Sequence, residues 1–124
     1  MMHKFLKIAR KVAMKSICRY RLGAVLVKGG AIINFGYNRT GHHNLIEKKK
    51  TRDIDQLHAE VDAVLGIAKI ETRKCDIWIA RIKNDDQLGL AKPCEMCQLI
   101  LKEMGIRRVF YSIENEPFYD IIKL

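Results

Sequence analysis

Two short segments carry side chains whose types and spacing could support catalysis. The segments are His58-Ala59-Glu60 and Pro93-Cys94-Glu95-Met96-Cys97. Side chains three residues apart in the first turn of a helix share one face, so Cys94 and Cys97 can hold one ion. A helix N-terminus also carries partial positive charge, which favours the thiolate form that binds metals. The two segments therefore predict a metal site with His58, Cys94 and Cys97 as ligands.

This ligand set fits Zn²⁺ in a catalytic role. Two thiolates and a neutral imidazole balance the charge of the ion, and three protein ligands leave one tetrahedral position open for water. Zinc lowers the pKa of that water towards neutrality, so hydroxide becomes available as a nucleophile near neutral pH. The pattern His-x-Glu followed by Pro-Cys-x-x-Cys is similar to the signature of zinc deaminases that act on nucleobases. That similarity implies that Glu60 is the catalytic proton shuttle between the water, a nucleobase ring nitrogen and departing ammonia.

The elements that position these segments follow from hydrophobic spacing and turn signals. Apolar spacing predicts an opening helix at residues 2–17 and a further helix at 58–69. A hairpin is expected from strands 22–28 and 31–37, which flank the turn Gly29-Gly30. Strands at 76–82 and 106–112 should enclose a helix at 94–104, and residues 118–124 could form an edge strand or a short helix. Residues 38–56 and 84–92 are expected to be loops. The alternation of helix and strand from residue 58 onward favours parallel pairing.

The size and composition of the chain indicate one globular domain spanning residues 1–124. The chain has 48% hydrophobic and 30% charged residues, which argues against both a disordered chain and a membrane span. The N-terminus lacks the uncharged stretch of a secretory signal, so we expect a cytoplasmic protein without a membrane partner. Its thiols should stay reduced there, which favours metal binding by the close cysteine pair over a disulfide.

The formal net charge of +9 attracts polyanions and phosphates, but it does not locate a site. Lys4, Lys7, Lys11 and Lys15 recur at helical spacing opposite an apolar stripe. They are therefore typical of the solvated face of an amphipathic helix, and a surface for nucleic acid or phosphate is the alternative.

Beyond the metal motifs, the sequence resembles the zinc-dependent cytidine and deoxycytidylate deaminase superfamily. Gly23-Ala24-Val25-Leu26-Val27, followed by Gly36-Tyr37-Asn38, is similar to the first hairpin of that family, and Gly105-Ile106-Arg107-Arg108-Val109-Phe110-Tyr111 is similar to its segment after the second motif. The resemblance implies an α/β protein with a three-layer α/β/α fold and a mixed sheet of about five strands. Zinc would lie between the N-termini of the two motif helices.

The resemblance also implies substrate contacts. Asn38 would bind the sugar, the Ala59 backbone N–H would meet the base carbonyl, and the Lys92 backbone carbonyl would face the departing amine. A homo-oligomer is implied as well. The chain departs from the family pattern in residues 83–91, where a longer loop is expected to border the site.

The function expected from this resemblance is hydrolytic deamination of a cytosine nucleotide or nucleoside, with dCMP the preferred small-molecule substrate. Basic residues after Asn38 could hold its phosphate. One alternative is a deaminase of nucleic acid, either tRNA adenosine or single-stranded DNA cytosine. Another is a non-catalytic zinc-binding module.

Several individual residues also have a purely structural interpretation. The zinc site could be structural, with a fourth ligand drawn from Cys18, Cys75, His42 or His43. Cys18 and Cys75 are otherwise expected to be buried thiols, and Trp78 and Phe110 core residues. Arg107 and Arg108 could bind phosphate or simply face solvent.

Overall fold

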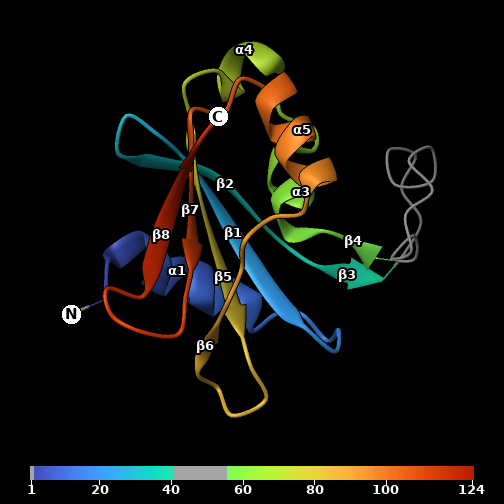
Figure 1. Cartoon of the computed structure of the whole chain (residues 1–124). Coiled ribbons are helices and arrows are strands. Elements are labelled where there is room, and N and C mark those ends of the chain that lie inside the picture. The colour runs from blue at the N-terminus through green and yellow to red at the C-terminus, as the bar shows by residue number, and fades with distance from the viewer. Residues whose placement is uncertain (1, 41–55) are drawn as a thin grey trace.

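A computed structural model describes residues 2–40 and 56–124, and Figure 1 shows their arrangement. The helices are α1 (Lys4–Ala13), α3 (Ala59–Val64), α4 (Lys69–Thr72) and α5 (Glu95–Glu103). The strands are β1 (Arg21–Lys28), β2 (Ala31–Tyr37), β3 (Arg39–Thr40), β4 (Gln56–Leu57), β5 (Asp76–Ile82), β6 (Leu88–Gly89), β7 (Arg108–Ser112) and β8 (Tyr119–Lys123).

The main sheet is mixed, with the strand order β2-β1-β5-β7-β8 and with β6 paired to the end of β5. Strand β1 runs antiparallel to both β2 and β5. Strands β5 and β7 are parallel, as the alternation of helix and strand predicts, and α5 forms part of their crossover. A separate two-stranded sheet pairs β3 with β4.

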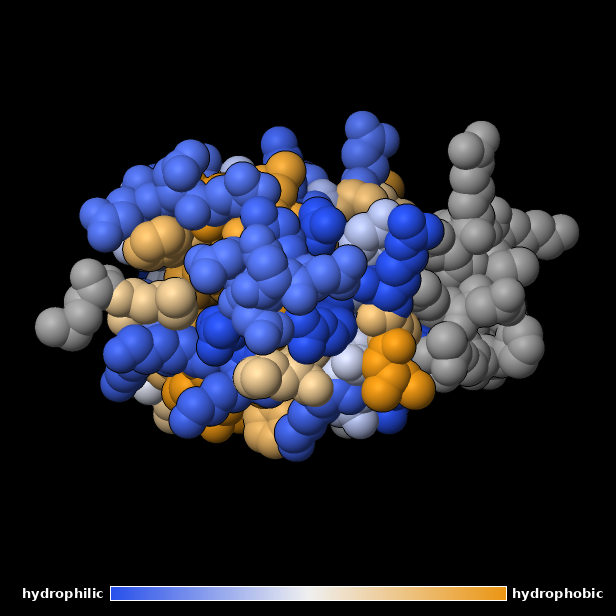
Figure 2. Space-filling view, turned by 90° about the horizontal axis from the view of Figure 1, so that it is seen from below, coloured by the Kyte–Doolittle hydropathy of each residue, from blue (hydrophilic) through white to orange (hydrophobic). Residues whose placement is uncertain are grey.

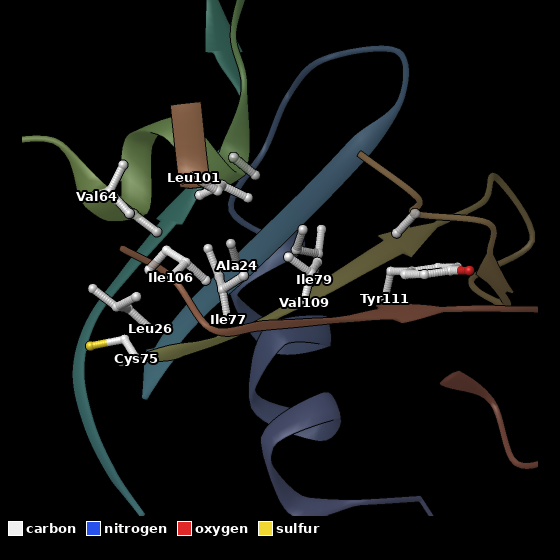
Figure 3. Packing of buried hydrophobic residues seen from close by; sticks show 13 residues of the cluster. Ala24, Leu26, Val64, Cys75, Ile77, Ile79, Leu101, Ile106, Val109 and Tyr111 are labelled. Atoms are coloured by element: carbon white, nitrogen blue, oxygen red, sulfur yellow. The ribbon is translucent and has the colours of Figure 1, made fainter. Parts of the chain in front are cut away.

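Helices cover both faces of the sheet, which makes the three layers of the expected α/β/α fold (Figure 1). Successive side chains of a strand point to opposite faces, so β1 directs Val25 and Val27 towards α1 and Ala24 and Leu26 towards α3 and α5. Figure 3 shows the packing on the second face, where Leu101 of α5 meets aliphatic side chains of the central strands.

Two glycines allow α1 and α3 to lie close to the sheet. A β-carbon at Gly23 would collide with the backbone of Ala9 and Ala13 in α1. A β-carbon at Gly36 would lie 2.5 Å from the backbone nitrogen of Ala63 in α3. Because α3 carries one of the motifs, the glycine in β2 sets how closely that motif approaches the sheet.

The strand predictions are largely confirmed, including 31–37 and 76–82, and residues 118–124 form a strand rather than a helix. The helix predicted at 58–69 is too long, because Leu65 is extended and Gly66 has a φ of +77°, which ends α3 at Val64. The opening helix is likewise shorter than residues 2–17. Residues 84–92 are not simply a loop, since β6 returns along β5 as a hairpin.

The surface agrees with the amphipathic interpretation of the N-terminal helix. Lys4, Lys7, Lys11 and Lys15 are exposed. The molecular face seen from below in Figure 1 is mostly hydrophilic with scattered apolar residues (Figure 2). No helix within residues 2–40 and 56–124 has the length and apolar character required to cross a bilayer.

Candidate metal centre and active site

His58 and Cys94 occupy equivalent places at the starts of two neighbouring helices. Each residue is extended and directly precedes the first helical turn, His58 before α3 and Cys94 before α5. Their backbone carbonyls accept the first helical hydrogen bonds, from Asp62 N at 2.9 Å and from Gln98 N at 2.9 Å respectively. The helix starts therefore bring together two motifs that are far apart in the sequence.

The predicted ligands form a compact cluster. One ligand atom from each of His58, Cys94 and Cys97 lies within 4.8 Å of the others. The Nδ1 atom of His58 is 3.1 Å from Cys97 Sγ and 3.6 Å from Glu60 Oε1. Zinc binds nitrogen and sulfur at about 2.0 to 2.3 Å, so donors on one ion lie about 4 Å apart, and the cluster fits such an ion.

Hydrogen bonds within the cluster shift the pKa values of its side chains. Hydrogen bonding to Cys94 and then to Glu60 outweighs burial and raises the pKa of His58 to about 10. A hydrogen bond from the Cys97 thiol and a second from His58 lower the pKa of Cys94 to about 4. The hydrogen bond to Cys94 and burial raise the pKa of Cys97. Cys94 is thus held as a thiolate, the form that a metal requires.

Polar side chains fix the helix that begins after His58. Asp62 accepts a hydrogen bond from the backbone N–H of Tyr37 at 3.1 Å and pairs with the Arg39 guanidinium at 2.7 Å. The amide of Asn34 donates to the carbonyl of the next residue, Ala63, at 2.7 Å. The second half of this short helix is consequently attached to β2 and to the residue pair that follows it.

The segment before Cys94 is held by Ser112, whose side chain is fully buried. Its hydroxyl donates to the Gly89 carbonyl at 2.6 Å and accepts from the Arg81 backbone N–H at 3.0 Å. Its backbone carbonyl accepts from the Ala91 N–H at 3.0 Å. The end of β7 thereby positions the chain that leads into the cysteine motif.

A cavity of about 330 Å³ opens beside the ligand cluster. His58, Glu60 and Cys94 contribute to its wall. All three residues predicted to contact substrate, Asn38, Ala59 and Lys92, line it as well. Arg19, Tyr20, Leu22, Ala91 and Pro93 complete the lining and were not singled out from the sequence as substrate contacts. The spacing of motifs cannot reveal these residues, because their proximity depends on how the hairpin and the 83–93 segment fold.

Asn38 is buried with 2% of its surface exposed, and its amide is already engaged. Its Oδ1 accepts from the Leu22 backbone N–H at 2.8 Å, and its Nδ2 donates to the Tyr20 carbonyl. The side chain therefore fixes the start of β1 against the end of β2. One amide hydrogen is left over for a ligand in the cavity.

The other residues singled out from the sequence do not line the active-site cavity. Arg107 and Arg108 pair with Asp76 at 3.3 and 2.7 Å and do not line the active-site cavity. Arg107 is exposed to solvent, as expected for one of the two, and Arg108 is half-buried. Trp78 and Phe110 are core residues that stack on one another, as expected. Cys75 is buried, but the prediction of a buried thiol was wrong for Cys18, which is only half-buried because it follows the end of α1.

A structural site with a fourth protein ligand finds no support within residues 2–40 and 56–124. The ligand cluster there contains three residues, and neither Cys18 nor Cys75 belongs to it. The predicted candidates His42 and His43, and the basic residues 48–52, lie outside the described residues.

Known proteins resemble this chain in sequence and in fold. The family model of the cytidine and deoxycytidylate deaminase zinc-binding region matches residues 1–113. No curated protein matches the sequence significantly.

Solved structures share the fold. The dCMP deaminase of cyanophage S-TIM5 in apo form is 23% identical, with a TM-score of 0.65 over 90% of this chain and 82% of that chain. In its complex with dCMP and dUMP, the same enzyme is 24% identical, with a TM-score of 0.63 over 90% and 79%. The cytidine deaminase of Burkholderia pseudomallei is 17% identical, with a TM-score of 0.67 over 99% and 93%.

The family match extends over most of the chain and includes both motifs. It establishes zinc as the cofactor, and the three-ligand cluster is a site that can hold it. The chain therefore belongs to the cytidine and deoxycytidylate deaminase family and is a zinc-dependent hydrolytic deaminase.

Proposed function

We propose that this protein deaminates a free cytosine nucleotide, with dCMP converted to dUMP and ammonia. The observation that carries the proposal is the placement of Glu60 beside the His58, Cys94 and Cys97 cluster in the wall of one cavity. Zinc in that cluster would make a water molecule acidic enough to supply hydroxide near neutral pH. The cavity volume of about 330 Å³ suits one small ligand.

Glu60 is proposed to carry the protons of the reaction. Only 4% of its surface is exposed, and its carboxylate is 3.6 Å from the His58 ring. It would accept a proton from the attacking water and deliver it to the ring nitrogen beside the attacked carbon. It would then move the second proton of the water to the amino group as the carbon–nitrogen bond breaks. The sum is cytosine plus water giving uracil plus ammonia.

Three further groups are proposed to orient the substrate. The remaining amide hydrogen of Asn38 would bind the sugar, while the Ala59 backbone N–H would bind the base carbonyl. The Lys92 backbone carbonyl would accept a hydrogen bond from the departing amine. All three residues line the cavity, which supports these assignments. The rigid attachment of Asn38 to Leu22 and Tyr20 would present its amide in one orientation.

The preference for dCMP is supported by the similarity of the fold to a phage enzyme whose structure holds dCMP and dUMP. The formal net charge of +9 favours a second candidate, deamination of a base within tRNA or single-stranded DNA. The expected homo-oligomer, the cytoplasmic location and the activity of residues 1–124 as one domain stay predictions.

The proposal is tested with a panel of substrates. Purified zinc-loaded protein is incubated with dCMP, CMP, deoxycytidine, cytidine, a cytosine-containing single-stranded oligonucleotide and tRNA, and ammonia and product mass are measured. We expect dCMP to give the highest kcat/KM. Activity on the polymers alone, falling steeply with salt, would replace the proposal by the nucleic-acid alternative. If none of the six substrates is deaminated, both the mononucleotide proposal and the nucleic-acid alternative are overturned.

A further inference from the structure

Arg81 lies at an unusual place for a charged side chain. In β5 the side chains of Ile77 and Ile79 belong to the core beneath α3 and α5, and the two-residue period of a strand puts Arg81 on the same face. Its cross-strand neighbour in β1 is Leu22, a residue of the active-site cavity. The Arg81 side chain therefore lies on the face of the sheet that α3 and α5 cover, next to the site.

The Arg81 guanidinium also has an unsatisfied donor. Its Nε is a buried side-chain nitrogen that has no hydrogen-bond partner among the described residues. Such a group costs free energy unless a ligand or water satisfies it. The guanidinium carbon lies 4.9 Å from the centre of the Tyr20 ring, and that of Arg19 lies 5.4 Å from the same ring. Both guanidinium groups contact the Tyr20 ring, and neither has a hydrogen-bond acceptor among the described residues.

Other cations near this part of the sheet are neutralised by carboxylates. Arg21 pairs with Asp86 at 3.0 Å, and Lys83 pairs with Glu114 at 3.4 Å. By contrast, Arg19, Arg81 and Lys92 have no carboxylate within 4.0 Å in residues 2–40 and 56–124. Arg19 and Arg81 thus contact the Tyr20 ring. Lys92 lines the same cavities as Tyr20, and all three cations are without a carboxylate partner in the described part of the chain.

Arg81 and Lys92 border a hollow that adjoins the active-site cavity, and Arg19 lines the cavity itself. The hollow, about 340 Å³, is lined by Tyr20, Leu22, Arg81, Leu90, Ala91 and Lys92. Four of these residues, Tyr20, Leu22, Ala91 and Lys92, also line the cavity that contains Glu60. A ligand whose base occupies the cavity could therefore extend a charged group into the hollow.

We propose that Arg81, with Arg19 and Lys92, forms the subsite for the phosphate of the nucleotide substrate. This inference rests on the proposed function and places the phosphate at residues other than the basic residues after Asn38, of which 48–52 lie outside the described residues. A guanidinium offers several N–H donors in a planar fork that matches a phosphate, which explains an arginine with an unpartnered Nε at this place. Arg39, Arg107 and Arg108 are occupied by Asp62 or Asp76.

The test compares Arg81→Gln with Arg21→Gln, a matched control from the adjacent strand. Arg21 lies opposite Ile82, so it projects from the other face of the sheet and has its own carboxylate partner. The first measurement is the melting temperature of zinc-loaded protein in sodium phosphate and in sodium chloride of equal ionic strength. The second is the ratio of kcat/KM for dCMP to that for deoxycytidine.

We expect phosphate to raise the melting temperature of the wild type and Arg21→Gln but not of Arg81→Gln. The dCMP to deoxycytidine ratio should fall about ten- to a hundredfold in Arg81→Gln, the effect of losing hydrogen bonds to a charged group. Arg81→Lys, which keeps the charge without the fork, should give an intermediate ratio. If Arg81→Gln responds to phosphate like the wild type, or keeps its ratio, the subsite is overturned while the proposed function stands.

Two further outcomes separate the subsite from the proposed function. If no substrate in the panel is deaminated but phosphate still stabilises the protein through Arg81, the proposed function fails and the anion subsite survives. If Arg81→Gln loses activity on a single-stranded oligonucleotide but not on dCMP, the assignment to a mononucleotide phosphate is overturned.

Discussion

His58 and Cys97 approach to 3.1 Å between Nδ1 and Sγ, although 39 positions separate them in the sequence. His58 directly precedes α3, and Cys97 lies in the first turn of α5. The distance between their ligand atoms therefore depends on how both helices pack on the sheet. Residues that set this packing should affect zinc binding without touching the metal.

Gly36→Ala should push α3 away from β2. The added β-carbon would lie 2.5 Å from the Ala63 backbone nitrogen, so the helix must move. We expect a loss of about 1 to 3 kcal/mol in the free energy of unfolding, as for other overpacked sites, together with weaker zinc binding. Urea unfolding and zinc titration measure the two effects. Gly30→Ala, in the β1–β2 turn, is the control: its φ of +81° strains an alanine and should lower stability, but the β-carbon meets no atom within 4 Å, so zinc affinity should stay unchanged. Equal zinc affinity in Gly36→Ala would contradict this role.

Ser112→Ala should destabilise the segment that leads into the cysteine motif. The substitution leaves the Gly89 carbonyl and the Arg81 backbone N–H without their hydroxyl partner. Unpaired buried polar groups of this kind cost about 1 to 3 kcal/mol. Hydrogen exchange should show faster exchange at Arg81 and in the chain preceding Cys94. Exchange rates and stability like those of the wild type would show that the hydroxyl does not hold this segment.

Zinc binding should release protons and become tighter as pH rises. The pKa of His58 is raised to about 10 and that of Cys97 is also raised, whereas the pKa of Cys94 is lowered to about 4. At neutral pH, His58 and Cys97 therefore hold protons that must leave before these residues become ligands, which gives about two protons per zinc. Calorimetry in buffers of different ionisation enthalpy counts them. Zinc binding without proton release, or with an affinity independent of pH near neutrality, would disprove the ligand assignment.

Asp76→Asn should lower stability at neutral pH but have less effect in acid. Burial raises the pKa of Asp76, but hydrogen bonds from Arg108 and Arg107 outweigh it and hold the pKa below its ordinary value of 3.8. A depressed carboxyl pKa in the folded state contributes stability above the unfolded pKa, and this contribution disappears as pH falls through the folded pKa. The stability difference between wild type and variant, followed by thermal unfolding, should shrink below pH 3.8. A difference that is constant across this range would contradict the ion pairing.

The sequence predicts the centre of the site better than its surroundings, for a physical reason. The metal ligands and Glu60 belong to two motifs in which local helix geometry limits where the side chains point. The strands could be located because their side chains alternate or form buried runs. The early end of α3 depends on one left-handed glycine, Gly66, inside an otherwise helical pattern.

The lining of the cavity depends on long-range packing, which a local pattern does not contain. Tyr20 and Ala91 meet at the site because β1 and β5 pair, and Ser112 is important because β7 passes beside the β5–β6 hairpin. Arg81 is an exception that could have been found. A charge that continues the alternating core stripe of Ile77 and Ile79 is a signal in the sequence itself.

The most direct test of the account is the activity of Glu60→Gln at full zinc loading. Glutamine keeps the shape of the side chain but cannot carry protons, so kcat for dCMP should fall by about a hundredfold or more while zinc content stays that of the wild type. Glu95→Gln is the control, since Glu95 is an exposed carboxylate in the first turn of α5 that does not line the cavity. Its activity should be retained. If Glu60→Gln turns over dCMP like the wild type, Glu60 is not the proton carrier and the proposed chemistry is wrong.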